Sequence, residues 1–536
     1  MDLDHVERWD TCEFSFAAAQ SYANPFRDVS LSATLIHARS GTARTVDGFY
    51  DGGDTWRLRL MPDRVGTWQV RTHSDDPGLD GHEQTFECVP PEKPYLHGPL
   101  GVRGYHFVHA DGTPRFLLST RLSCHLEPPE VWQAAIDYLS AHQVNRVLFV
   151  LGGVHGTIAD LYGPNLDFWR YNVGKFQAVD RFIDALRKTD VLAAPYFYYF
   201  DDRQQRAMTA DQDRAYLRYG MARLGAYANV LPVLANEVEQ KTTDRRGQYD
   251  LRSHRWANKM GAFLKELAVY GQPVTVHNPM ETENAVRPGF YTLLQDWPFV
   301  HWTDYMLRQA QVAALSTAPE LSDDVPEGKE PLYNLRGYAR HNQLLIDLRQ
   351  FGQPVVNEEP GYEMEGRSAF PDSTEVQLKP WNSQTPDTLL ATFWTAVTAG
   401  GYVTWGNSAT YWFVDPLPGI QRSPTPGHLR VLHEVVSALP YPQMDPDNAC
   451  VSPADREVEG QYYRTNFCLA SSGEVYLIFS LLGGPLTVVP EPGQDYQVTR
   501  IDPRSGERAD LGTIDGHPQE LVLPAGEQVL LLQKDG

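Results

Sequence analysis

Strand-like and helix-like segments alternate between residues 144 and 237: VNRVLFVLG (144–152), KFQAVDRFIDALRKT (175–189), VLAAPYFYYF (191–200), DRAYLRYGMARLGAYA (213–228) and VLPVLANE (230–237). The first, third and fifth segments are short apolar runs, which is typical of buried strands. In the second and fourth segments, apolar residues recur at helical spacing. This order predicts a parallel sheet, because a crossover helix returns the chain to the edge where the previous strand began.

The same alternation continues on both sides of this stretch. Further strand candidates are RFLLST (115–120), QPVTVHN (272–278), FVHWTDY (299–305), QPVVNEE (353–359) and GYVTWGN (401–407). Further helix candidates span residues 128–142, 253–271, 338–352 and 389–401. Eight strand-then-helix units predict an α/β protein built on a (β/α)8 TIM barrel. A doubly wound open sheet is the alternative, but no GxGxxG or GxxxxGK[ST] turn follows the first strand.

The two flanks of the chain show a different pattern, with short alternating segments separated by turn residues. Such segments fill residues 14–89 and predict an N-terminal immunoglobulin-like β-sandwich. A similar set follows residue 460 and predicts a C-terminal β-sandwich. We therefore expect three domains, with boundaries at residues 1–92, 97–440 and 441–536.

Composition and charge exclude several classes of protein. Hydrophobic residues make up 42% of the 536-residue chain, which is enough for a full core. The net charge of −22 predicts no binding to nucleic acid or to an anionic membrane surface, and favours neutral over anionic glycans. No apolar run is long enough for a membrane helix, for which about 18 residues are needed.

Cysteine usage and the amino terminus bear on the compartment. Five cysteines without a CxxC spacing predict reduced thiols and no zinc site. The sequence MDLDHVERWD shows no basic region followed by an apolar run, so a cytoplasmic protein is the default expectation. Removal of a signal peptide from a longer precursor stays open as an alternative.

Glutamates stand at the ends of two predicted strands. Asn236-Glu237 ends the fourth strand and Glu358-Glu359 ends the seventh. In a barrel, the active site forms at the carboxyl ends of the strands, where the fourth and seventh strands lie across the mouth from each other. Two carboxylates placed in this way predict glycoside hydrolysis, in which one protonates the leaving oxygen and the other attacks the anomeric carbon.

These strand ends resemble those of the clan A glycoside hydrolases, which are retaining (β/α)8 enzymes. The resemblance is carried by ANE (235–237), PVVNEEPGYE (354–363) and the aromatic residue near the end of the eighth strand. Two further segments, HFVHADGTPRFLLST (106–120) and DPRSG (502–506), resemble the apiosidase-like barrel proteins, a group that also carries a collagen-binding label. Relatives in this group also carry an N-terminal immunoglobulin-like domain.

The resemblance implies roles for individual residues. Glu237 matches the acid/base, and Asn236 matches the asparagine that hydrogen-bonds the sugar 2-hydroxyl. Glu359 matches the nucleophile, because the family places a glutamate two residues before a glycine, here Gly361. Pro360 departs from the aromatic residue that is usual between them.

Four aromatic or histidine side chains complete the predicted site. Trp405 matches the eighth-strand aromatic that stacks on the sugar, and an indole suits the apolar face of a sugar ring. His277, Trp302 and Tyr305 end the fifth and sixth strands, where the clan keeps residues that line the substrate site. A tyrosine hydroxyl in that place would also hold the nucleophile ionised through a hydrogen bond.

Four of these assignments have a structural alternative. Glu237 would also suit the first turn of a helix, where the helix dipole favours a carboxylate. The Glu358-Glu359 pair would suit a solvated acidic turn, Trp405 a plain core position, and His277 a hydrogen-bonded structural position.

The sequence therefore predicts a retaining glycoside hydrolase that acts on an oligosaccharide or glycoside without a cofactor or metal. A catalytically inactive barrel that binds carbohydrate is the alternative, but the presence of both Glu237 and Glu359 favours the enzyme. A metal-dependent hydrolase would need histidine and aspartate ligands, and the chain has no HxH or HExxH motif. The sugar, the linkage, exo or endo action and the oligomeric state stay open, a homo-oligomer included.

Overall fold

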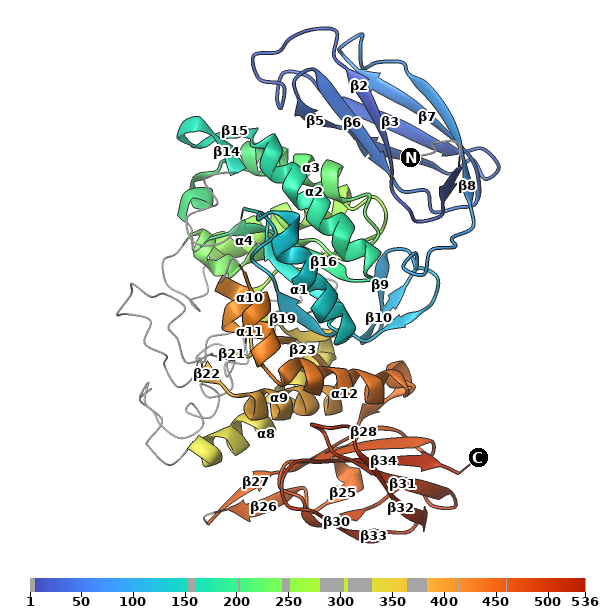
Figure 1. The fold of residues 1–536 in the computed structure, drawn as a ribbon, viewed down its shortest axis with the longest axis vertical. Coiled ribbons are helices and arrows are strands. Elements are labelled where there is room, and N and C mark those ends of the chain that lie inside the picture. Colours follow the sequence, from blue (N-terminus) through green and yellow to red (C-terminus); the bar gives the residue numbers. More distant parts are fainter. Residues whose placement is uncertain are drawn as a thin grey trace.

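The computed structural model describes most of the chain. The described residues are 5–152, 161–200, 203–242, 251–279, 303–306, 330–363, 383–412, 415–458 and 460–535. Figure 1 shows a central α/β region between two sets of β-sheets, with the N-terminal set at one end and the C-terminal set at the other.

The N-terminal set consists of two sheets that share one apolar core. The larger sheet has the strand order β1 (His5–Glu7), β8 (Glu83–Val89), β7 (Gly66–Ser74), β3 (Leu31–His37) and β4 (Ala43–Asp47). The smaller sheet has the order β2 (Cys12–Ala17), β6 (Thr55–Leu60) and β5 (Phe49–Gly52). Alternate residues are buried along β3, as expected for a strand with one face on a core.

A short antiparallel sheet leads into the central region. Its strands are β9 (Leu100–Arg103), β10 (His106–His109) and β11 (Pro114–Arg115). The first strand of the central sheet is β12 (Ser119–Arg121), which begins later than the predicted segment 115–120. The reason is Asn145, whose side chain accepts a hydrogen bond from the Leu118 N–H at 3.0 Å and donates one to the Phe116 carbonyl at 2.8 Å. This side chain takes the place of a backbone partner for these two groups, although the Leu118 carbonyl still accepts from the backbone N–H groups of Asn145 and Arg146.

The central sheet has eight strands, and each of the eight predicted strand regions contributes one. Their order is β17 (Val233–Asn236), β16 (Leu192–Tyr199), β13 (Arg146–Val150), β12, β23 (Tyr402–Trp405), β20 (Val355–Asn357), β19 (Thr303–Met306) and β18 (Asn278–Pro279). Every pairing in this sheet is parallel. The central region is therefore the parallel, TIM-like α/β architecture that the sequence predicts.

The first and last strands of this order are also joined. Leu234 N–H donates to the Thr275 carbonyl at 2.8 Å, and His277 N–H donates to the Ala235 carbonyl at 3.0 Å. Residues 275–277 directly precede β18, so these hydrogen bonds link the two ends of the sheet.

Helices follow seven of the eight strands within the described residues. They are α1 (Pro129–Ala141), α2 (Val173–Lys188), α3 (Ala210–Leu224), α4 (Leu251–Leu267), α8 (Glu330–Leu348), α9 (Pro386–Thr398), and, after β23, α10 (Ser408–Trp412), α11 (Leu417–Arg422) and α12 (Thr425–Ser437). Thr209 and Thr385 begin α3 and α9 with capping boxes, in which a side chain satisfies free N–H groups of the first turn. In the described part of the chain, no helix is long and apolar enough to cross a membrane.

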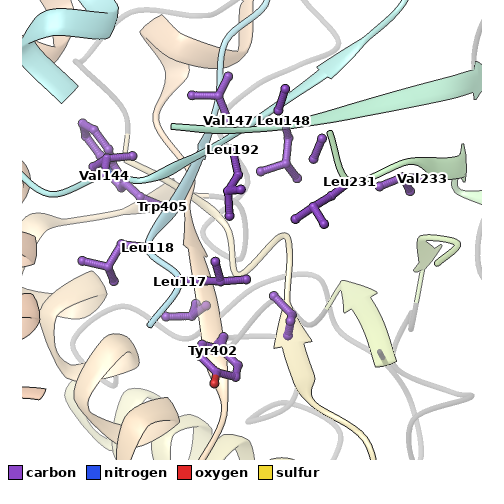
Figure 2. Packing of buried hydrophobic residues seen from close by; sticks show 14 of the residues in the cluster. Leu117, Leu118, Val144, Val147, Leu148, Leu192, Leu231, Val233, Tyr402 and Trp405 are labelled. Atoms are coloured by element: carbon purple, nitrogen blue, oxygen red, sulfur yellow. The ribbon is translucent and has the colours of Figure 1, made fainter. Parts of the chain in front are cut away.

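Buried apolar residues hold the central sheet together. Figure 2 shows this packing close up. The labelled residues belong to strands or to the segments directly before them: Leu117, Leu118, Val144, Val147, Leu148, Leu192, Leu231, Val233, Tyr402 and Trp405.

The C-terminal set contains a six-stranded sheet and two smaller sheets. The large sheet has the order β24 (Asp445–Pro446), β28 (Asn466–Ser471), β29 (Val475–Ser480), β34 (Gln528–Lys534), β31 (Asp495–Ile501) and β32 (Arg508–Asp515). The smaller sheets are β25 (Val451–Ser452), β30 (Gly484–Val488) and β33 (Gln519–Leu523), and the hairpin β26 (Asp455–Val458) and β27 (Gln461–Arg464). The ring of Trp394 in α9 stacks on Phe479 of β29 with centroids 6.1 Å apart, which joins this set to the central region.

Buried ion pairs join the N-terminal sheets to the helices of the central region. Arg59 of β6 pairs with Asp180 of α2 at 3.1 Å, and Arg223 of α3 pairs with Asp180 at 2.6 Å and with Asp51 of β5 at 2.8 Å. Burial opposes ionisation of Asp180, yet the two guanidinium groups lower its pKa below the usual value. Alternating charges from both sides therefore form one network across this contact.

Candidate active site

Glu237 directly follows β17 in a conformation that few side chains adopt. Its backbone has φ 41° and ψ 63°, in the left-handed region, where it precedes the short helix η4 (Val238–Lys241). A residue other than glycine held there stores about 1–3 kcal/mol of strain, and such residues cluster at functional sites. The side chain is only 3% exposed.

A chain of hydrogen-bond donors reaches the carboxylate of Glu237. Gln240 Nε2 donates to Glu237 Oε2, and Arg206 Nη2 donates to Gln240 Oε1 at 3.0 Å. Neither donor was predicted from the sequence. In the sequence, only their positions in the loops after the third and fourth strands could have indicated a role in the site.

The neighbouring residues Glu358 and Glu359 have different surroundings. Arg146 of β13 pairs with Glu358 at 2.6 Å, and Thr404 of β23 donates to the second carboxylate oxygen at 2.5 Å. Two strands, β12 and β23, separate β13 from β20 in the sheet, so the Arg146–Glu358 pair spans one face of the sheet. Both side chains are almost fully buried, at 0% and 1% exposure. Glu358 is therefore a partner in a structural ion pair.

Glu359 instead faces groups at the carboxyl ends of the strands. The Tyr362 hydroxyl donates to Glu359 Oε1, and His277 Nε2 lies 3.7 Å from Glu359 Oε2. The backbone N–H of Glu359 donates to Asn357 Oδ1 at 3.3 Å. Burial lowers the pKa of His341 to about 3, so its neutral ring accepts a hydrogen bond from Asn357 Nδ2 at 3.1 Å. A buried chain of hydrogen bonds, from the Glu359 N–H through Asn357 to His341, thus orients the predicted nucleophile.

His277 contacts both predicted catalytic segments. Its carbonyl accepts a hydrogen bond at 3.2 Å from Val238, the residue directly after Glu237, while its ring lies beside Glu359. The side chain is 1% exposed. The geometry brings the end of β17, residue 277 and Glu359 together at one edge of the sheet.

The structure describes the side chains of two other predicted site residues, the backbone alone of a third, and nothing of the fourth. Asn236 is buried at the end of β17, paired in register with Tyr199 of β16. Trp405 is fully buried, and its indole N–H donates to Glu363 at 3.1 Å. Tyr305 lies in β19, where only the backbone is described, between Asn278 and Asn357. Trp302 lies outside the described residues.

Two glycines permit a close crossing beside Glu359. Gly361 has φ 116°, which favours glycine. A Cβ added to Gly406 would lie 2.0 Å from the Gly361 carbonyl oxygen, so no larger residue fits there. This crossing seats Tyr362, which the sequence analysis did not single out, within reach of Glu359.

Metal-ligand side chains do not gather in the described part of the chain. No group of three or more His, Cys, Asp or Glu residues there is arranged to hold a metal ion. The five cysteines are free and buried.

Comparison with solved structures shows the same overall fold in glycoside hydrolases. A candidate glycoside hydrolase from Bacteroides vulgatus ATCC 8482 matches 99% of this chain and 100% of its own, with TM-score 0.74 and 19% identity. A family 5 glycoside hydrolase from the same organism matches 82% of this chain and 94% of its own, with TM-score 0.60 and 13% identity. At these identities the likeness concerns the fold.

Comparison with protein families gives a closer assignment, although no curated protein matches the chain. The model of a domain of unknown function, DUF5060, matches residues 5–75. The model described as the apiosidase-like catalytic domain matches residues 103–423, which is more than half of the chain and includes Glu237, Asn236, His277, Glu359 and Trp405. The resemblance seen in the sequence is confirmed: the chain belongs to the apiosidase-like family, with an N-terminal DUF5060 domain.

Proposed function

We propose that the protein is a retaining glycoside hydrolase that cleaves an O-glycosidic bond in an oligosaccharide or glycoside. Glu237 protonates the leaving oxygen and then activates water, and Glu359 forms the covalent glycosyl-enzyme. Asn236 binds the sugar 2-hydroxyl, and Trp405 presents an aromatic face to the sugar ring. His277, Trp302 and Tyr305 line the same site. The reaction needs no cofactor.

The observation that carries this proposal is the different environment of two adjacent glutamates. Glu358 is tied to Arg146 inside the sheet, whereas Glu359 faces Tyr362 and His277 at the strand ends. A hydroxyl donor favours the ionised form of a carboxylate, and a nucleophile must be ionised. His277 also joins Glu359 to the segment of Glu237, which supports a common site.

In this protein, we propose, the parallel sheet closes into a (β/α)8 barrel. The hydrogen bonds between β17 and residues 275–277 support closure. The domain boundaries 1–92, 97–440 and 441–536 belong to the same proposal, with the N-terminal and C-terminal β-sandwiches packed on the barrel.

A screen of aryl glycosides and natural oligosaccharides tests the proposal. We expect the wild-type protein to hydrolyse at least one of them with retained anomeric configuration, and Glu359→Gln to lose turnover by about 10⁴-fold or more. Binding of oligosaccharides without turnover of any substrate would instead identify an inactive carbohydrate-binding barrel. Inversion of configuration would contradict the double-displacement mechanism.

A further inference from the structure

Arg121 lies beside the predicted catalytic residues and has no role in the function proposed above. It ends β12, in register with Leu148 of β13, at the same edge of the sheet as Glu237 and Glu359. Ser119, two residues earlier, accepts a hydrogen bond at 3.4 Å from Arg146, whose ion pair with Glu358 spans one face of the sheet. Side chains two residues apart on a strand share a face, so Arg121 also lies on that face, one layer nearer the strand ends.

Aromatic rings surround the Arg121 guanidinium. Its central carbon lies 5.7 Å from the ring centroid of Tyr199 at the end of β16, and 5.2 Å from that of Tyr411 in α10. The Tyr411 ring meets the Tyr362 ring edge-on, with centroids 4.7 Å apart. Burial opposes the charge, yet the nearby tyrosines and Glu359 raise the pKa of Arg121 above its usual value. The side chain is therefore a cation held between ring faces, close to the predicted nucleophile.

One edge of this guanidinium has no acceptor. Within the described residues, Nε and Nη2 of Arg121 are both buried without a hydrogen-bond partner. Arg121 as a whole is half-buried, whereas the buried arginines of the described chain each pair with a carboxylate: Arg59, Arg146, Arg187, Arg223 and Arg349. Two buried donors of a cation without an acceptor are costly, and this indicates that a ligand supplies the acceptor.

The two free donors fit one ligand group in particular. The Nε–H and one Nη2–H lie in the guanidinium plane and point in the same direction. Together they can donate to the two oxygens of one carboxylate. A single hydroxyl would satisfy only one donor and would bring no charge. The net charge of −22 repels anionic sugars at long range, so binding them needs such a local cation.

We propose that Arg121 binds the carboxylate of a uronic acid, in the sugar ring that Glu359 attacks. The inference rests on the proposed function for the position of that ring. Arg121 is then a specificity-determining residue, and the substrate is a uronoside. This substrate class differs from the neutral glycans that the net charge favours.

Matched substrates test the proposal. The full chain is assayed with 4-nitrophenyl glucuronides and galacturonides and with the corresponding glucosides and galactosides, in both anomeric forms. We expect kcat/KM to be at least 100-fold higher for one uronoside than for its neutral counterpart. We expect Arg121→Met to lower that kcat/KM at least 100-fold and the neutral value less than threefold. Arg121→Lys keeps the charge without the bidentate edge, so its loss should be intermediate.

Two controls keep the test decisive. Arg430→Met on the exposed face of α12 should change neither activity, and thermal unfolding checks that each variant is folded. Calorimetric titration with free glucuronate and galacturonate gives a readout that needs no catalysis. Binding that Arg121→Met abolishes, in a protein that hydrolyses nothing, would support the uronate site and overturn the proposed hydrolase.

Two results would overturn the uronate site. One is hydrolysis of neutral glycosides by the wild-type protein without binding or hydrolysis of uronosides, which would leave the hydrolase intact. The other is an equal loss for both substrates in Arg121→Met, which would make Arg121 a general structural residue.

Discussion

The Nε2 atom of His277 lies 3.7 Å from Oε2 of Glu359, across β19, which separates their strands in the sheet. The same histidine accepts a backbone hydrogen bond from Val238, next to Glu237. One residue thus fixes the two predicted catalytic segments relative to each other. Its backbone holds one segment, and its ring faces the carboxylate of the other.

The hydroxyl of Tyr362 should set the pH dependence on the acid side. Removing it in Tyr362→Phe takes away a hydrogen bond that favours the ionised carboxylate of Glu359. We expect the acid limb of the kcat/KM profile to move up by about one pH unit, and kcat/KM at neutral pH to fall about tenfold. Tyr411→Phe is the matched control, because the Tyr411 hydroxyl donates to the backbone carbonyl of Glu358, at 3.4 Å, and not to the carboxylate of Glu359 in any contact described above. An unchanged acid limb in Tyr362→Phe would remove this tyrosine from the mechanism.

Glu358 should matter for stability rather than for chemistry. Glu358→Gln leaves Arg146 buried without its carboxylate, so we expect the free energy of unfolding to fall by about 3–5 kcal/mol. Glu434→Gln, at an exposed ion pair of α12, should cost less than about 1 kcal/mol. Denaturant unfolding measures both. Folded Glu358→Gln protein that lacks turnover, beside fully active Glu359→Gln, would reverse the assignment of the two residues.

Glu237 should be needed only in steps that require proton transfer to the leaving group or from the attacking water. Glu237→Gln should spare the first step for aryl glycosides with good leaving groups, because these depart without protonation. The second step should then be slow, and azide should restore turnover because it attacks without a general base. Product analysis checks this, since the glycosyl azide should keep the configuration of the substrate. If azide does not restore turnover of Glu237→Gln, a residue other than Glu237 activates water in the second step.

The ion network between the N-terminal sheets and the helices should depend on pH in a defined direction. Because Arg59 and Arg223 lower the pKa of Asp180, its contribution to stability is complete above the unfolded value of 3.8. The contribution is lost as the pH falls below that value. We expect Asp180→Asn to unfold more easily than wild type at pH 6 by about 3–5 kcal/mol, with the difference shrinking below pH 4. If the difference in unfolding free energy between wild type and Asp180→Asn were constant from pH 6 to pH 2, the charge of Asp180 would not be its cause.

Chelation should leave the activity unchanged, because both protonation and attack are assigned to carboxylates. Dialysis against a chelator followed by the aryl glycoside assay measures this. Loss of turnover that a divalent cation restores would contradict the two-glutamate mechanism.

The sequence was most informative about strand order and the polar residues at strand ends. Apolar runs and helical spacing located all eight strand regions, since both follow from burial. Strand limits were less predictable, because the side chain of Asn145, from another segment, takes the place of a backbone partner for the Leu118 N–H and the Phe116 carbonyl.

Partners within the site depend on contacts between distant segments. The spacing of a glutamate two residues before a glycine pointed to Glu359, but the pairing of Glu358 with Arg146 depends on which strands face each other across the sheet. Likewise, the sequence shows Arg121 only as a residue at the end of a strand. Its unpaired donors and its contacts with the rings of Tyr199 and Tyr411 depend on the folded structure.

Trapping the covalent intermediate tests the central claim most directly. The wild-type protein is treated with an activated 2-deoxy-2-fluoro glycoside of the sugar that it hydrolyses, and the labelled peptide is sequenced by mass spectrometry. We predict one sugar per chain, attached to the carboxylate of Glu359. A sugar on Glu358, or no adduct in an enzyme that releases product with inverted configuration, would contradict the account.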